Sequence, residues 1–204
     1  MAGPPSATSP PGYRLGVVGF AHMHVNESIT RFTALDAVRL VACADTQPRV
    51  PSTTDVEGSR RANLRRALGH PDGPKGYLDY REMLDREQLD IVILCPEVAR
   101  HAEVAVELAA RGVHMVTEKP LAADLPGARR MVAAAHAAGV MLMVNWPTTW
   151  DPAIRRVKDV IDAGEIGDVW QVKWRNGASL GPLAAGSRHP GDTVVSGTVS
   201  DEEL

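Results

Sequence analysis

Aromatic residues, cysteines and long apolar runs are scarce in this sequence, and each scarcity excludes a class of protein. Phe, Trp and Tyr make up only 4% of the 204 residues, although 44% are hydrophobic. The core must therefore be aliphatic, which suits a parallel sheet that is buried on both faces. The two cysteines, Cys43 and Cys95, lie in apolar runs, which favours reduced thiols and a cytoplasmic protein over a disulfide framework. No apolar segment approaches the ~18–20 residues that a membrane span needs.

A dominant charge of one sign is also missing. The formal net charge is -3 and the two signs are interspersed, which argues against nucleic-acid and membrane partners. Residues 1–13 are rich in Pro, Ser and Ala and lack the basic region and apolar stretch of a signal peptide. They are predicted to form a disordered leader.

What the chain does contain is a regular alternation of apolar runs and helix patterns. It predicts a Rossmann-type, doubly wound parallel sheet over residues 14–146. We expect a turn cluster at 70–76, and a solvated helix face formed by Arg60, Arg61, Arg65 and Arg66. Strands are predicted at 15–18, 38–44, 91–95, 113–117 and 140–144, and helices at 23–35, 59–68, 80–86, 99–111, 124–138 and 151–163.

Residue types at the helix ends support these limits. Asp124 followed by Pro126 is typical of a helix start, because Asp caps the first turn and proline is well tolerated within that turn. Gly112 and Gly139 follow two predicted helices, where a positive φ is usually needed.

The turn after the first predicted strand reads Gly19-Phe20-Ala21-His22-Met23-His24. A dinucleotide site needs a tight turn there, so that backbone N–H groups and a helix N-terminus can meet a pyrophosphate. Against the usual Gly-x-Gly-x-x-Gly pattern, Gly19 matches, Ala21 is a small substitute and His24 is a departure. We predict that residues 19–22, Phe20 and His22 included, contact a dinucleotide.

His22 and His24 also raise the possibility of a metal ligand pair, since imidazole is a common ligand. On a helix, however, residues i and i+2 point to different sides. The sequence therefore predicts no metal site.

Asp45 ends the second predicted strand, some 26 residues after Gly19. An acidic side chain there accepts hydrogen bonds from the adenine ribose hydroxyls and repels a 2′-phosphate, which favours NAD over NADP. The alternative is that Asp45 is an ordinary strand-end turn aspartate.

Glu118-Lys119-Pro120 follows the apolar run at 113–117. A lysine just past the carboxyl end of a parallel strand lies at the crevice where open α/β sheets bind ligands, and proline ends the strand and fixes the turn. The alternative is a solvent-exposed turn lysine.

Together these segments resemble the Gfo/Idh/MocA oxidoreductases, the family of glucose–fructose oxidoreductase and inositol dehydrogenase. The Glu-Lys-Pro motif and the Gly-Glu-Ile-Gly stretch at 164–167 are the most diagnostic. The departures are the Gly19 turn and Val98, near which the family often has an asparagine. The similar segments, in family order, are 16–19, 44–45, 90–95, 100–103, 117–122 and 164–169.

The resemblance implies an enzyme that transfers hydride between NAD, less favourably NADP, and a sugar, polyol or related hydroxy compound. Lys119 would be catalytic and, with Glu118, would flank the nicotinamide. A full-length form is expected to be a homo-oligomer. Further cofactor contacts are expected from Cys95, Pro96, His101 and Trp146, with helix-end packing the alternative for His101 and domain-junction packing that for Trp146.

Residues 147–204 are interpreted as the truncated start of an α+β substrate and oligomerisation domain. We expect residues 169–174 to be its first strand, with Trp170 and Trp174 on one face. Residues 177–204 offer no second strand, and His189 lacks the Asp-x-x-x-His spacing of the family. The alternative to an oxidoreductase is a non-catalytic dinucleotide-binding remnant or regulatory module.

Overall fold

The computed structural model describes residues 12–47 and 55–173. The contacts among these residues divide them into two units: the first ends at Val144 and the second begins at Asn145. The predicted leader lies almost wholly outside the described residues, as does the segment 177–204. The predicted domain limits 1–13, 14–146 and 147–204 stay predictions.

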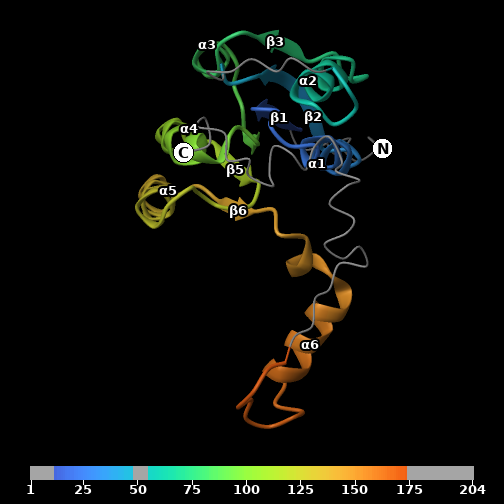
Figure 1. The fold of residues 1–204 in the computed structure, drawn as a ribbon, viewed down its shortest axis with the longest axis vertical. Coiled ribbons are helices and arrows are strands. Elements are labelled where there is room, and N and C mark those ends of the chain that lie inside the picture. Colours follow the sequence, from blue (N-terminus) through green and yellow to red (C-terminus); the bar gives the residue numbers. More distant parts are fainter. Residues whose placement is uncertain (1–11, 48–54, 174–204) are drawn as a thin grey trace, which may run out of the picture. The chain divides into compact units, whose positions relative to one another are not determined.

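The first unit is built on a six-stranded, all-parallel sheet with the strand order β3-β2-β1-β4-β5-β6 (Figure 1). The order reverses between β1 and β4, so the predicted doubly wound Rossmann sheet is confirmed. The strands are β1 Tyr13–Val18, β2 Val38–Ala44, β3 Lys75–Tyr77, β4 Ile91–Leu94, β5 His114–Thr117 and β6 Leu142–Val144. The helices are α1 His24–Thr33, α2 Arg60–Leu68, α3 Tyr80–Arg86, α4 His101–Ala110 and α5 Leu125–Ala138, with a 3₁₀ turn η1 at Val98–Arg100.

Two largely aliphatic cores cover the two faces of the sheet, with Tyr80 in one and Phe20 in the other. Leu15 and Val17 of β1 pack with Ile29 of α1 on one face. Val92 of β4 packs with Leu108 of α4 on the other. Alternate residues of the strands thus enter opposite cores, as a pleated strand requires.

The predicted helix ends are confirmed. The Asp124 side chain accepts a hydrogen bond from the Gly127 N–H at 2.5 Å. Gly112 and Gly139 have φ values of +73° and +67°, and Gly139 caps α5 in the left-handed conformation.

Two local predictions were wrong. The segment expected to be a turn at 70–76 runs into β3, which pairs with β2 at the sheet edge; a strand of three residues is too short to leave a pattern in sequence. Arg60 is not solvated like Arg61, because the first turn of α2 lies against the strand ends, and its side chain is only 11% exposed.

The second unit contains the 3₁₀ turn η2 Pro147–Trp150 and the helix α6 Pro152–Asp162. Asp151 caps α6 by accepting the Ala153 N–H at 2.8 Å, as expected for an Asp-Pro start. The predicted strand at 169–174 was wrong within the described residues, because 169–173 form no strand and Trp170 is 89% exposed. A strand needs a hydrogen-bonded neighbour, and no strand occurs among residues 145–173. No helix in the described part of the chain is long and apolar enough to cross a membrane.

Candidate functional site

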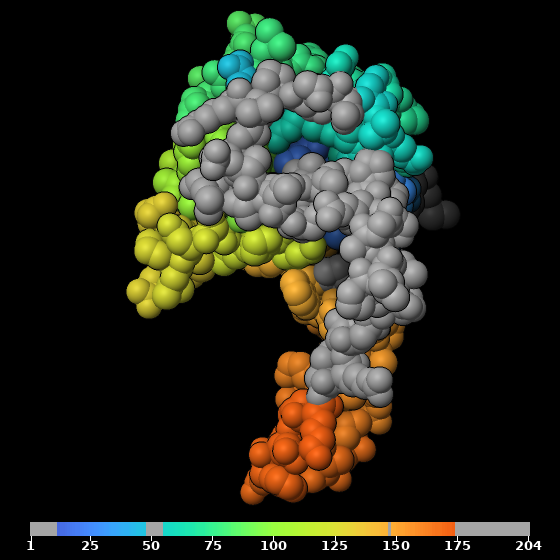
Figure 2. Space-filling view, in the orientation of Figure 1, coloured from blue at the N-terminus to red at the C-terminus, as the bar shows by residue number. Residues whose placement is uncertain are grey.

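Four strand ends bring the predicted site residues to one edge of the sheet. β1, β2, β4 and β5 are mutually parallel, so the residues that follow them lie at the same edge. These residues are Gly19, Asp45, Cys95 and Glu118. The space-filling view shows blue atoms from the N-terminal part of the described chain next to the cyan atoms around α2 (Figure 2).

Gly19 is confined by the chain that follows β4. Its φ is +84°, and a Cβ atom at this position would lie 2.2 Å from the backbone nitrogen of Pro96. The backbone N–H of Ala21 donates to the Cys95 carbonyl at 2.9 Å. The turn after β1 is therefore fixed against the end of β4, where only glycine fits.

Several predicted cofactor residues can offer only backbone atoms. The Phe20 side chain is fully buried in the core between α1, α2 and the sheet. Cys95 is also fully buried, its thiol donates to the His22 carbonyl at 3.6 Å, and burial raises the pKa of the thiol to about 12. Pro96 is buried beside Gly19. Their contact with a cofactor stays a prediction.

Asp45 belongs to a buried charged group that we call the Arg60 cluster: Asp45, Thr46, Arg60 and Glu97. The Arg60 guanidinium donates to the Asp45 carboxylate at 2.8 Å and to that of Glu97. The Thr46 hydroxyl donates to Glu97 at 2.8 Å. Burial raises the pKa of Asp45, and the Arg60 charge opposes that rise. The sequence did not reveal Arg60 and Glu97, because the contacts are tertiary.

His101 connects the loop after β4 to the Glu-Lys-Pro segment. Its Nε2 lies 3.3 Å from the Pro96 carbonyl oxygen, and its Nδ1 lies 3.1 Å from that of Pro120. The ring is 1% exposed, and burial lowers its pKa. These contacts fit the packing alternative, in which His101 holds the two loops together.

Glu118 joins the Glu-Lys-Pro segment to the turn after β1. It is 5% exposed, and its Oε2 lies 3.2 Å from His24 Nδ1. Oε2 also accepts the Lys119 backbone N–H at 3.3 Å. Lys119 is partly exposed and precedes a cis proline; its ammonium group has no ion-pair partner among the described residues. The two predicted cofactor segments therefore lie against each other.

The two histidines of the turn do not point apart. α1 begins at His24, with Met23 as its N-cap, so His22 precedes the helix and the expectation of opposite sides was wrong. The two ring centroids are 4.0 Å apart in an edge-to-face arrangement. Potential ligand atoms of His22, His24 and Glu118 all lie within 4.8 Å of one another.

Trp146 lies in the second unit, after β6, and is 51% exposed. A role for Trp146 at the cofactor stays a prediction.

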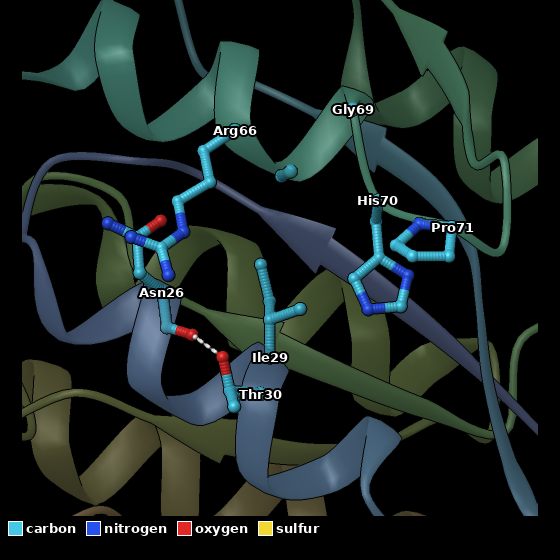
Figure 3. A pocket seen from close by; sticks show the side chains of 8 residues that line it. Asn26, Ile29, Thr30, Arg66, Gly69, His70 and Pro71 are labelled. Carbon is cyan, nitrogen blue, oxygen red and sulfur yellow. Dashed lines mark hydrogen bonds between the residues drawn. The ribbon is translucent and has the colours of Figure 1, made fainter.

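A separate small cavity lies between α1 and the end of α2 (Figure 3). Its volume is about 230 Å³. Asn26 and Thr30 line it from α1, and Arg66 and His70 lie on the opposite side. None of the predicted site residues lines this cavity.

The reversal of strand order at β1 and β4, the glycine turn and the acidic residue after β2 define a dinucleotide-binding Rossmann domain. The chain belongs to the Gfo/Idh/MocA family: the family model, described as an oxidoreductase family with an NAD-binding Rossmann fold, matches residues 13–146.

Curated relatives include the dTDP-3,4-didehydro-2,6-dideoxy-alpha-D-glucose 3-reductase of Actinomadura kijaniata, which is 28% identical over 76% of this chain and 43% of its own. D-apiose dehydrogenase of Paraburkholderia graminis is 43% identical over 50% of this chain and 28% of its own. The WlbA dehydrogenase of Bordetella pertussis, solved with NADH and UDP-GlcNAcA, is 26% identical with a TM-score of 0.64 over 78% of this chain and 42% of its own. The chain thus spans less than half the length of these relatives.

Proposed function

We propose that this chain supplies the cofactor domain of an NAD(P)-dependent oxidoreductase that transfers hydride between a nicotinamide and a hydroxyl-bearing carbon of a sugar, polyol or related compound. The observation that carries the proposal is the contact of Glu118 with His24. This contact places the Glu-Lys-Pro segment against the dinucleotide turn. Lys119, the residue after Glu118, therefore lies at the same edge of the sheet. That relatives act on a dTDP-sugar, on D-apiose and on inositol supports this substrate class.

Each residue then has a separate task. The turn at Gly19 and the N-terminus of α1 receive the pyrophosphate, and the Asp45 carboxylate accepts hydrogen bonds from the adenine ribose. A bound nicotinamide supplies the hydride acceptor. The Lys119 ammonium group faces the substrate hydroxyl and stabilises the negative charge that develops on its oxygen as the C–H bond breaks. The N–H groups of Gly19 and Ala21 already donate to Ala44 and Cys95, so the pyrophosphate uses other donors of the turn.

We expect the chain to bind NAD(H) at least about tenfold more tightly than NADP(H), because the Arg60 cluster contains two carboxylates and one guanidinium and so repels a 2′-phosphate. Solved relatives hold either NADH or NADP, which makes the comparison informative. Calorimetric titration of both cofactors measures it. Equal affinity, or tighter NADP(H) binding, would contradict the role of Asp45.

Substitution Lys119→Ala should lower turnover by at least ~10²-fold, because a positioned cation is lost from the reacting oxygen. The measurement is made in a form of the protein that includes the substrate-binding part. The melting temperature should stay nearly unchanged, since Lys119 has no ion-pair partner among the described residues. Lys173→Ala, at another exposed lysine, serves as the control and should keep full activity.

Full turnover in Lys119→Ala would support the alternative that Lys119 is a solvent-exposed turn lysine without a catalytic role. NAD binding without turnover in the wild-type protein, for every sugar and polyol tested, would favour the regulatory module instead. We further propose a cytoplasmic homo-oligomer; the free, buried thiols of Cys43 and Cys95 support a reducing compartment.

A further inference from the structure

The geometry around His22, His24 and Glu118 points to a metal site at the same edge of the sheet as the proposed cofactor site: we infer that these three side chains bind a divalent transition-metal ion of the zinc class. Two imidazoles and one carboxylate are the protein ligands of one kind of catalytic zinc site. The inference goes beyond the proposed function, because neither hydride transfer nor dinucleotide binding requires a metal.

The donor atoms are already close to the spacing that a zinc ion needs. Zinc bonds of 2.0–2.2 Å place tetrahedral ligand atoms about 3.4 Å apart. His24 Nδ1 and Glu118 Oε2 are 3.2 Å apart, and no pair in the group exceeds 4.8 Å. Ring rotation therefore needs to close the longest separation by only about 1.4 Å.

A hydrogen bond orients the His22 ring. Its Nδ1 accepts a hydrogen bond from the His24 backbone N–H at 3.2 Å, so an ion bound at this nitrogen would take the place of that N–H. Metal binding requires neutral imidazoles. His22 is held in place, because its side chain is 7% exposed and its ring lies edge-to-face against His24.

The burial of the Glu118 carboxylate favours binding of a cation. Glu118 is 5% exposed, and positive charge beside a buried carboxylate stabilises it. A divalent ion bound by the two imidazoles and this carboxylate would place positive charge beside it. The His24 side chain is 31% exposed, which leaves an entry path and a coordination position for water.

The test is a titration of metal-free protein with Co²⁺ and Zn²⁺. Co²⁺ should give visible d–d bands of a low-symmetry site that saturate at one ion per chain, and Zn²⁺ should remove them. His24→Asn and Glu118→Gln should each weaken Co²⁺ binding by at least about 100-fold, because each removes one of three ligands. The exposed His136 of α5 provides the control: His136→Asn should leave binding unchanged.

Absence of saturable Co²⁺ binding to the wild-type protein would overturn the inference, as would binding that both ligand variants retain or that His136→Asn removes. Should a ligand variant fail to fold, X-ray absorption of the zinc-loaded wild type decides between two imidazole ligands and none. NAD binding is measured on the same samples. Metal binding without NAD binding would support this site and count against the proposed function, whereas the reverse would overturn the site alone.

Discussion

Replacing Gly19 with alanine is expected to lower the free energy of unfolding by about 3 kcal/mol or more and to abolish dinucleotide binding. Two costs combine. Gly19 has a φ of +84°, which alanine adopts only with strain, and the new Cβ would lie 2.2 Å from Pro96 N. Backbone atoms cannot rotate away as a side chain can, so the loop after β4 has to move. Urea denaturation and NAD titration measure the two effects.

Gly139→Ala separates backbone strain from the collision. Gly139 also has a positive φ, +67°, but a Cβ there would meet nothing within 4 Å. We expect this variant to lose only about 1–2 kcal/mol and to bind the cofactor normally. Equal stability of the two variants would contradict the close approach of Gly19 to the Pro96 backbone.

The second large effect is expected for Arg60→Ala, with a loss of about 3–5 kcal/mol in the free energy of unfolding. The substitution leaves Asp45 and Glu97 without their shared cation, although their side chains are only 18% and 4% exposed. Arg61→Ala, one residue further along α2 and exposed, should change stability by less than about 0.5 kcal/mol.

The pH dependence distinguishes lost charge compensation from lost packing. Burial already raises the pKa of Asp45, and the Arg60 charge opposes that rise. Without Arg60, the folded-state pKa of Asp45 should therefore rise further above its unfolded value, so the folded variant takes up a proton more readily than the unfolded chain. The stability deficit should therefore be largest near pH 7 and shrink as the pH falls toward about 4. A deficit that is independent of pH, or a variant as stable as Arg61→Ala, would contradict the role given to the Arg60 cluster.

The sequence by itself determined the fold class and much of the site. Apolar runs of strand length alternate with helix patterns that have Asp caps and terminal glycines, and this alternation predicts a parallel sheet. Each of these signals is local, so it can be read from the sequence. β2 at Val38–Ala44 and α3 at Tyr80–Arg86 have the predicted limits. Parallel order then brings Gly19, Asp45 and Lys119 to one edge, since every strand ends on the same side.

Only the tertiary structure decided which polar groups at that edge meet. Arg60 was predicted to be solvated, yet it pairs with Glu97, 37 residues further along the chain. His24 meets Glu118 across 94 residues, and His22 joins them because α1 begins two residues later than this histidine. Such contacts depend on where a helix starts and how its first turn meets the strand ends, and a shift of one residue turns a helix side chain by about 100°.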